Sequence, residues 1–171
     1  KYLDAAGRLI AFDQDPDALA NLWEAPNFNF VAANFAFLQN HLRMLGIKQV
    51  DGILADLGVS SHQFDTAQRG FSIREDAPLD MRMNRNGGQS AATIIATADE
   101  AKLASILYEY GELRNSRALA AQLVRQREHA PIDTTFALIK ALERFAPKFK
   151  DHKFYAQVFQ AFRIEVNQEL Q

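Results

Sequence analysis

Leu9-Ile10-Ala11-Phe12-Asp13 is a short apolar run that ends in an acidic residue. A run of this length, next to the turn residue Gly7, is typical of a buried strand, and we predict a strand over Arg8–Phe12. Asp15-Pro16 then favours the start of a helix, because the fixed φ of proline suits the first helical turn. A strand followed by a helix is the pattern from which the fold of residues 8–57 is predicted.

The same alternation continues along this stretch. Asn29–Ala33 is predicted to form a second strand, and Phe35–Leu45 a helix that Gly46 ends. Val50–Leu57 is predicted to form a third strand. Strands that alternate with helices indicate an α/β fold with a parallel sheet and crossover helices.

From Ala91 onward the pattern is helical throughout, whereas the stretch from Gly58 to Gly88 shows no sustained period. Thr134 or Thr135 can cap the third expected helix, and the last helix is predicted over Phe154–Leu170. The apolar positions expected to face inward are Leu103, Ile106, Leu107 and Tyr110; Leu119, Leu123 and Val124; Phe136, Ile139, Leu142 and Phe145; and Tyr155, Val158, Phe159, Phe162 and Val166.

Composition excludes several classes of protein. The 171 residues are 48% hydrophobic, which is enough for one sizeable core. The absence of cysteine excludes disulfides, thiolate catalysis and cysteine-ligated zinc. No apolar run approaches the roughly 20 residues of a membrane span, and no secretory signal is recognisable. We therefore expect a soluble, cytoplasmic protein without membrane contact.

Two acids end predicted strands. Asp13 and Asp56 both lie where parallel strands present their carboxyl ends, so we expect them at one crevice. An acid there can bind the hydroxyls of a ribose. The alternative for Asp13 is a helix cap, for which Asp15 and Asp17 compete. The four histidines show no ligand spacing, and we predict no metal site.

An ordered series of motifs begins at Asp56. It consists of Asp56-Leu57-Gly58-Val59-Ser60-Ser61, Gln63 with Asp65, Arg69-Gly70-Phe71-Ser72, Pro78-Leu79-Asp80-Met81-Arg82-Met83, Gly88-Gln89-Ser90-Ala91, Tyr110-Gly111-Glu112 and residues 159–170. In this order and spacing the series resembles the RsmH (MraW) family over essentially the whole chain. Proteins of that family transfer a methyl group from S-adenosylmethionine to the exocyclic N4 of a cytosine in 16S ribosomal RNA of the small subunit.

The resemblance implies a fold and a cofactor site. The fold is a Rossmann-like class I methyltransferase core with an inserted all-helical domain. It implies a partial core with the active-site loop over residues 1–90, the inserted domain over 91–153, and a helix returning to the core over 154–171. The residues that it implies for binding S-adenosylmethionine are Asp13, Phe35, Asp56 and Gln63.

Methyl transfer to an exocyclic amine needs a group that accepts an N–H bond and holds the nitrogen in line with the methyl. The candidates are Asp56, Ser60 and Ser61. The target base must be splayed out and held against an aromatic or arginine face. The candidates are Arg69, Phe71 and Arg82, with packing of the loop as the alternative for Phe71.

A basic window covers residues 114–153, with nine Lys/Arg against four Asp/Glu in a chain of net charge −2. Such a window is either a solvated helical surface or an electrostatic footprint for phosphates. With the resemblance, we expect Arg125, Arg127 and Lys148 to contact phosphates of the RNA.

The chain begins with Lys1 and ends within a helical pattern, so we expect an interior piece of a longer protein. The glycine-rich cofactor loop of the family has no counterpart in it. We therefore expect this chain alone to be a weak or inactive enzyme. We also expect either a longer parent with disordered termini, or a fragment that self-associates through the apolar face of Phe154–Leu170. The alternative functions are a non-catalytic RNA-binding module and a nicotinamide-dependent oxidoreductase.

Overall fold

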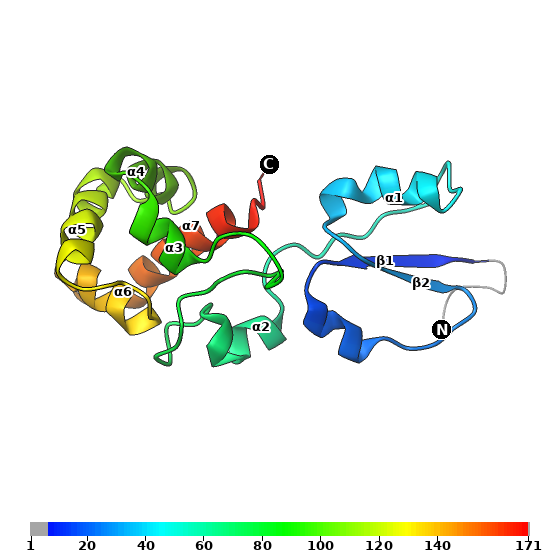
Figure 1. Cartoon of the computed structure of the whole chain (residues 1–171), viewed down its shortest axis with the longest axis horizontal. Helices are drawn as coiled ribbons and strands as arrows, with labels where there is room; N and C mark the ends of the chain where they lie inside the picture. Colours follow the sequence, from blue (N-terminus) through cyan, green and yellow to red (C-terminus); the bar gives the residue numbers. More distant parts are fainter. Residues whose placement is uncertain (1–6, 171) are drawn as a thin grey trace. The chain divides into compact units, whose positions relative to one another are not determined.

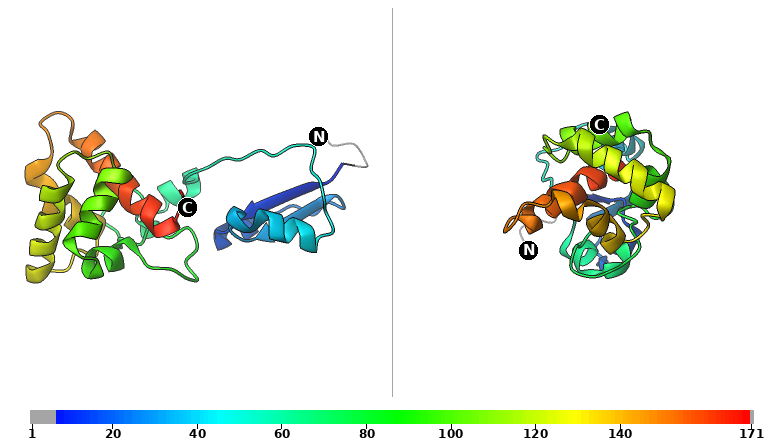
Figure 2. Two further views of the ribbon diagram at one scale, coloured as in Figure 1. Left: turned by 90° about the horizontal axis from the view of Figure 1, so that it is seen from above. Right: turned by 90° about the vertical axis from the view of Figure 1, so that its left-hand side faces the viewer.

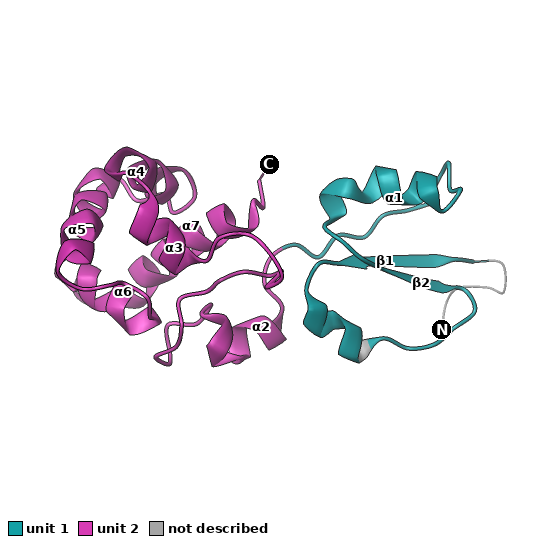
Figure 3. Cartoon of the chain, in the orientation of Figure 1, with its two compact units in different colours: residues 1–57 teal, residues 58–171 magenta. Residues whose placement is uncertain are grey.

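The computed structural model describes residues 7–170, apart from the side chain of Asn21. Two compact units divide the chain between Leu57 and Gly58 (Figure 3). We call them the strand unit (residues 1–57) and the helical unit (residues 58–171). Each unit contains its own secondary structure (Figure 1).

The strand unit is built on one parallel pair of strands. β1 (Leu9–Asp13) pairs with β2 (Phe28–Ala32) in a register that places Asp13 beside Ala32. Between them the chain returns through the 3₁₀ helix η1 (Pro16–Asn21). Pro16 is its first residue, as predicted for the start of a helix. The pair confirms the first two predicted strands and their parallel direction, which requires a crossover rather than a hairpin.

The helix predicted after the second strand is also confirmed. The 3₁₀ helix η2 (Phe35–Phe37) continues into α1 (Leu38–Met44). α1 lies over one face of the strand pair (Figures 1 and 2), where the rings of Phe12 and His41 meet edge to face with centroids 5.9 Å apart. Gly46 follows with a φ of 73°, a left-handed conformation that glycine adopts readily at helix ends.

The prediction of a third strand over Val50–Leu57 is wrong. This segment forms no ladder, and the side chains of Ile53, Leu54 and Leu57 are 71%, 98% and 69% exposed. A strand persists only where its backbone groups find hydrogen-bonded neighbours. Within residues 7–57 the only strands are β1 and β2, and neither pairs with this segment.

The helical unit combines short elements with longer helices. The short elements are α2 (Ser61–Asp65), η3 (Ala67–Arg69) and η4 (Glu143–Phe145). The longer helices are α3 (Ala91–Thr97), α4 (Glu100–Glu109), α5 (Ser116–His129), α6 (Thr135–Leu142) and α7 (Asp151–Asn167). α3 and α4 each pack against α5 and α7, and α6 packs against α5.

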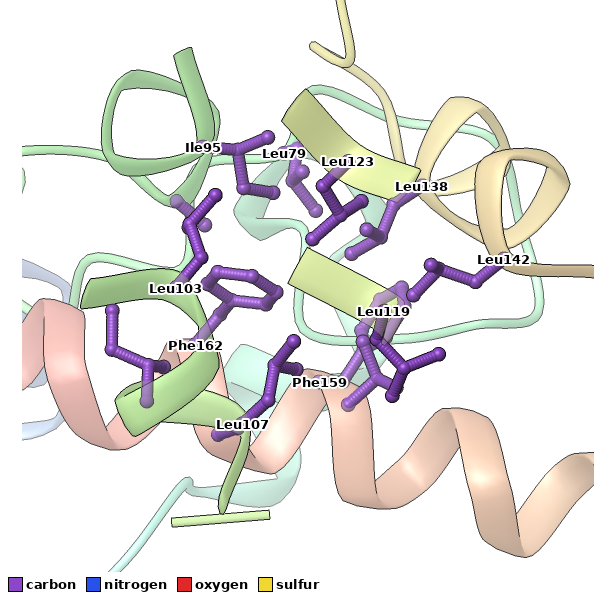
Figure 4. Packing of buried hydrophobic residues seen from close by; sticks show 14 of the residues in the cluster. Leu79, Ile95, Leu103, Leu107, Leu119, Leu123, Leu138, Leu142, Phe159 and Phe162 are labelled. Carbon is purple, nitrogen blue, oxygen red and sulfur yellow. The ribbon is translucent and has the colours of Figure 1, made fainter. Parts of the chain in front are cut away.

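One apolar core joins these helices. Phe162 of α7 lies among leucines of α4 and α5, which include Leu103, Leu107 and Leu119 (Figure 4). The faces predicted for α4, α5 and α7 are confirmed, since their leucine, isoleucine and phenylalanine positions are buried and only Tyr110, Val124 and Val166 are partly exposed. The apolar face of α7 is therefore buried within the unit and offers no surface for self-association.

The face predicted for α6 is partly wrong. Thr134 caps the helix by accepting a hydrogen bond of 3.1 Å from the amide of Ala137. Thr135 is fully buried, and Leu138 and Leu142 follow it at helical spacing into the core. Phe136 lies on the other side of the helix and is 44% exposed.

The segment that connects η3 to α3 packs on the helices. Phe71, Leu79, Met81 and Met83 all belong to the core of the helical unit. Gly70 makes this packing possible, because with its φ of 73° a Cβ would lie 2.3 Å from the carbonyl oxygen of Pro78. The predicted domain boundaries at 90/91 and 153/154 stay a prediction. In the structure, residues 58–90 pack as part of the helical unit.

Candidate functional site

The carboxyl end of the strand pair carries an acid. Asp13 ends β1, and its Oδ1 accepts a hydrogen bond of 2.8 Å from the amide of Asp15. Asp15 is the residue that caps η1, since its carboxylate accepts from the amide of Asp17 at 3.0 Å. The helix-cap alternative for Asp13 is therefore wrong, and its exposed carboxylate has capacity for further hydrogen bonds.

Phe35 follows the neighbouring strand at the same end of the sheet. Asn34 caps η2 by accepting from the amide of Ala36 at 2.9 Å, and its Nδ2 donates to Oε1 of Gln14 at 3.3 Å. This bond ties the turn after β2 to the turn after β1. The ring of Phe35 is 54% exposed. An accepting carboxylate and a flat exposed ring at one sheet edge suit the ribose and base of a nucleoside.

Asp56 lies in the strand unit but outside its sheet. The strand predicted to carry Asp56 does not form. Asp56 therefore lies in an irregular segment, with its carboxylate exposed. The meeting of Asp13 and Asp56 at one crevice stays a prediction.

Ser60 and Gln63 form a capping box at the start of α2. The hydroxyl of Ser60 accepts from the amide of Gln63 at 3.2 Å, and Oε1 of Gln63 accepts from the amide of Ser60 at 3.1 Å. Sequence reasoning missed this role, although Ser-x-x-Gln is its known signature. Gln63 is buried, whereas Ser61, the first residue of the helix, is exposed.

Arg69 is buried, which corrects its prediction as an RNA contact. Its side chain is 1% exposed, and its terminal nitrogen donates to the carbonyl oxygens of Arg82 and Met83 at 3.1 and 3.0 Å. Its own carbonyl accepts from the amide of Met81 at 2.9 Å. A buried guanidinium bound to carbonyls fixes the backbone of the loop and presents no face to a base.

Phe71 is also buried, so the packing alternative is correct for it. Its ring is 6% exposed and lies 5.9 Å from the guanidinium carbon of Arg69. One edge of the residue reaches a mostly apolar pocket of about 230 Å³ in the helical unit. The pocket is lined by Val59, Phe64, Phe71, Ile73, Met81, Ala156, Phe159, Gln160 and Arg163.

Arg82 is paired with Asp80. Its Nε and one terminal nitrogen contact the two carboxylate oxygens at 2.6 and 3.0 Å, and Arg85 lies 3.7 Å from the same group. Burial disfavours the charged carboxylate, but the hydrogen bonds and charge of Arg82 outweigh it and hold the pKa of Asp80 below its usual value. Arg82 stays partly exposed, so its contact with RNA remains a prediction.

Asn167 near the end of α7 holds the same loop from the other side. Its Oδ1 accepts from the amide of Met83 at 2.7 Å, and its Nδ2 donates to the carbonyl oxygens of Met81 and Arg163 at 2.7 and 2.9 Å. Met81 is fully buried with a φ of 61°, a conformation uncommon for a bulky residue. Asn167 belongs to the last motif of the series, but nothing in the sequence indicates which backbone groups it contacts.

The basic window separates into structural and exposed residues. Arg127 donates to the carbonyl oxygens of Ile95 and Ala98, both at 2.6 Å, and so satisfies the carboxyl end of α3. Arg127 is partly exposed, and its contact with an RNA phosphate stays a prediction. Arg125 and Lys148 are exposed, and a terminal nitrogen of Arg125 donates to Oε1 of the partly exposed Gln122 on α5 at 3.2 Å.

Among residues 7–170 no three histidine or acidic side chains come close enough to bind a metal ion together. None of the helices in the described part of the chain combines the length and apolar character that crossing a membrane requires.

In α/β proteins with parallel sheets, ligands bind outside the carboxyl ends of the strands, and here that end carries Asp13 and Phe35. Residues 1–171 match the model of the MraW methylase family. The chain belongs to the MraW methylase family, and the resemblance seen in the motif series is confirmed. Membership implies the Rossmann-like methyltransferase fold, with which the pair β1–β2 agrees.

Curated relatives bear one common name. Ribosomal RNA small subunit methyltransferase H of Cytophaga hutchinsonii is 54% identical over 167 residues, which cover 96% of this chain and 56% of that protein. The proteins of the same name from Bacteroides thetaiotaomicron and Flavobacterium johnsoniae are 51% and 49% identical, each over 99% of this chain and 56% of their own length. The chain thus spans about half the length of these relatives.

Proposed function

We propose that the protein is an S-adenosylmethionine-dependent methyltransferase that methylates the exocyclic N4 of a cytosine in 16S ribosomal RNA. The observation that carries the proposal is the family match over residues 1–171, with relatives named ribosomal RNA small subunit methyltransferase H. The partner is then 16S RNA or the small ribosomal subunit, in the cytoplasm. A nicotinamide-dependent oxidoreductase is disfavoured, because that class shares only the strand-end acid and not the motif series.

Asp13 and Phe35 are proposed to hold the nucleoside part of the cofactor. The exposed carboxylate can accept from ribose hydroxyls, and the exposed ring at the same sheet edge can stack on the base. Asp56 and Gln63 are proposed as further cofactor contacts. When bound, S-adenosylmethionine supplies a methyl group on a positively charged sulfur.

The residues proposed to orient the target amine are Asp56, Ser60 and Ser61. An exposed carboxylate or hydroxyl oxygen that accepts an N–H bond fixes the amine and draws its lone pair toward the methyl. The hydroxyl of Ser60 already accepts a hydrogen bond within the capping box, which makes it a positioning group for the turn. Asp56 and Ser61 are exposed and therefore the stronger candidates.

The helical unit is proposed to bind the RNA through residues of the inserted domain, 91–153. Arg125 and Lys148 are exposed and carry the charge that phosphates require. Arg82 is proposed to approach the target from the loop, held in place by Asp80. In this arrangement residues 1–90 and 154–171 contribute to the methyltransferase core.

Calorimetry with the protein at full family length tests the cofactor. We expect S-adenosylmethionine to bind and NAD to give no heat. Asp13→Asn should weaken binding about tenfold or more, because hydrogen bonds to a charged group contribute about 1.5–3 kcal/mol. Glu24→Gln, at an exposed acid of the same unit, should change nothing. Binding of NAD without S-adenosylmethionine would refute the proposal.

A further inference from the structure

The turn between η4 and α7 presents an aromatic side chain entirely to solvent. Phe149 is 100% exposed, in contrast to Phe154, which is 5% exposed only five residues later. The amide of Lys150 donates to the carbonyl of Pro147 at 3.1 Å and closes the turn. A fully exposed phenylalanine in a closed turn contributes nothing to the core of its own unit.

The backbone at Phe149 has an unusual conformation for this residue type. Its φ is 65°, in the left-handed region that glycine and asparagine adopt far more easily. Met81 also has a positive φ, but its side chain is fully buried and its carbonyl is held by Asn167. At Phe149 no burial compensates for the conformation, so folding alone does not account for a phenylalanine there.

The residues around Phe149 are positively charged. Lys148 and Lys150 flank it directly, and Arg144 and Lys153 lie within the same short stretch. All four cationic side chains are exposed, and the stretch 143–153 contains only Glu143 and Asp151 as acids. The guanidinium of Arg144 lies over the ring of Phe145, 4.7 Å from its centroid.

An exposed ring between cations suits an unpaired nucleotide. Bases stack on aromatic side chains, and the adjoining phosphates attract lysine and arginine. An apolar protein partner would instead require a larger apolar patch than a single ring. We propose that Phe149 stacks on an unpaired base of the RNA substrate, while Lys148 and Lys150 bind the phosphates on either side. The inference rests on the proposed function, because it assumes an RNA ligand.

Substitutions at Phe149 separate stacking from other contacts. The probe is a single-stranded RNA oligonucleotide that contains the target cytosine, and the readout is its dissociation constant. We expect Phe149→Ala and Phe149→Leu to weaken binding about tenfold, since stacking on one base contributes about 1–3 kcal/mol. Phe149→Tyr should retain affinity because it keeps the ring. Equal affinity of the leucine variant and the parent would mean an apolar contact and would overturn the proposal.

The lysines are tested by the salt dependence of binding. Lys148→Gln with Lys150→Gln should reduce the slope of log K against log salt by about 1.4, from about 0.7 for each phosphate contact on a single strand. Phe149→Ala should leave this slope unchanged. Lys140→Gln with Arg117→Gln, exposed cations of α6 and α5, is the matched control for loss of charge. A slope that the turn variant and the control reduce equally would show a diffuse attraction and reject the assignment to this turn.

The test also distinguishes this inference from the proposed function. The parent protein is assayed for S-adenosylmethionine binding and methyl transfer beside each variant. If the parent binds cofactor and methylates RNA while Phe149→Ala binds RNA equally well, only the inference fails. If the parent neither methylates nor binds RNA, the proposed function fails as well. Unchanged melting temperatures establish that the variants are folded.

Discussion

The helical unit and the strand unit bury their apolar residues to very different degrees. In the helical unit one continuous cluster joins the longer helices with the loop that carries Met81. Among the described side chains of residues 7–57, only that of Asp15 is buried. The apolar side chains there are all partly or fully exposed. The helical unit therefore stabilises itself, whereas the described part of the strand unit lacks a core of its own.

This difference shows what each kind of element needs. A helix satisfies its backbone within one segment and needs only a packing face. A strand needs at least one neighbouring strand to pair with, and the segment of Ile53 and Leu54 pairs with neither β1 nor β2, so these side chains remain exposed. The two units therefore differ because a helix needs only a packing face, whereas a strand also needs a pairing partner.

The largest expected effect is on the core of the helical unit. Phe162→Ala should lower the free energy of unfolding by about 3–5 kcal/mol, because it removes a fully buried ring from a packed core. Phe37→Ala, at a ring that is 57% exposed in the strand unit, should lower it by less than about 1 kcal/mol. Urea unfolding measures both. Similar losses for the two variants would break the comparison between the units.

A smaller effect is expected at Asn167. Asn167→Ala removes three hydrogen bonds and leaves the amide of Met83 without its acceptor, which should cost about 1–3 kcal/mol. Asn40→Ala, at an exposed position of α1, is the matched control and should change stability by less than about 0.5 kcal/mol. Hydrogen exchange should accelerate at the amide of Met83 in the first variant. Unchanged exchange there would show that α7 does not hold the loop.

The pair of Asp80 and Arg82 predicts a dependence on pH. The pKa of Asp80 is lower in the folded protein than in the unfolded chain. Its stabilising contribution is therefore fully present above about pH 4, the ordinary range of an aspartate, and is lost as the pH falls further. Asp80→Asn should reduce the drop in unfolding free energy between pH 7 and pH 3, whereas Glu128→Gln on α5 should not. An unaltered drop in the first variant would contradict a paired carboxylate.

The smallest expected effect on stability is at Phe149. Because its ring is fully exposed, Phe149→Ala should change the free energy of unfolding by less than about 0.5 kcal/mol. Thermal unfolding measures this change. A loss comparable to that of Phe162→Ala would mean that the ring packs within the protein, which conflicts with a surface free to bind RNA.

Local patterns in the sequence predicted β1, β2 and the core-facing positions of α4, α5 and α7, because periodicity and end signals act over a few residues. They did not predict α2 or η3, which lie in the stretch without a sustained period. The capping box at Ser60 also has a local signature, a serine followed three residues later by Gln63. The backbone contacts of Arg69 and Arg127 could not be predicted. Both guanidinium groups bind carbonyl oxygens of segments distant in sequence, and only the folded chain brings these together. The same reason explains why the third strand is missing. The apolar pattern of Val50–Leu57 does not indicate whether another strand lies beside it.

The activity that we propose for the full-length protein is methyl transfer to a cytosine of ribosomal RNA. The most direct measurement incubates the full-length protein with isotope-labelled S-adenosylmethionine and small ribosomal subunits, then digests the RNA to nucleosides and separates them by mass. The account predicts one labelled product, N4-methylated cytidine, and a strong reduction of it with Asp13→Asn. Label on another nucleoside, or none in RNA while the protein binds its cofactor, would contradict the account.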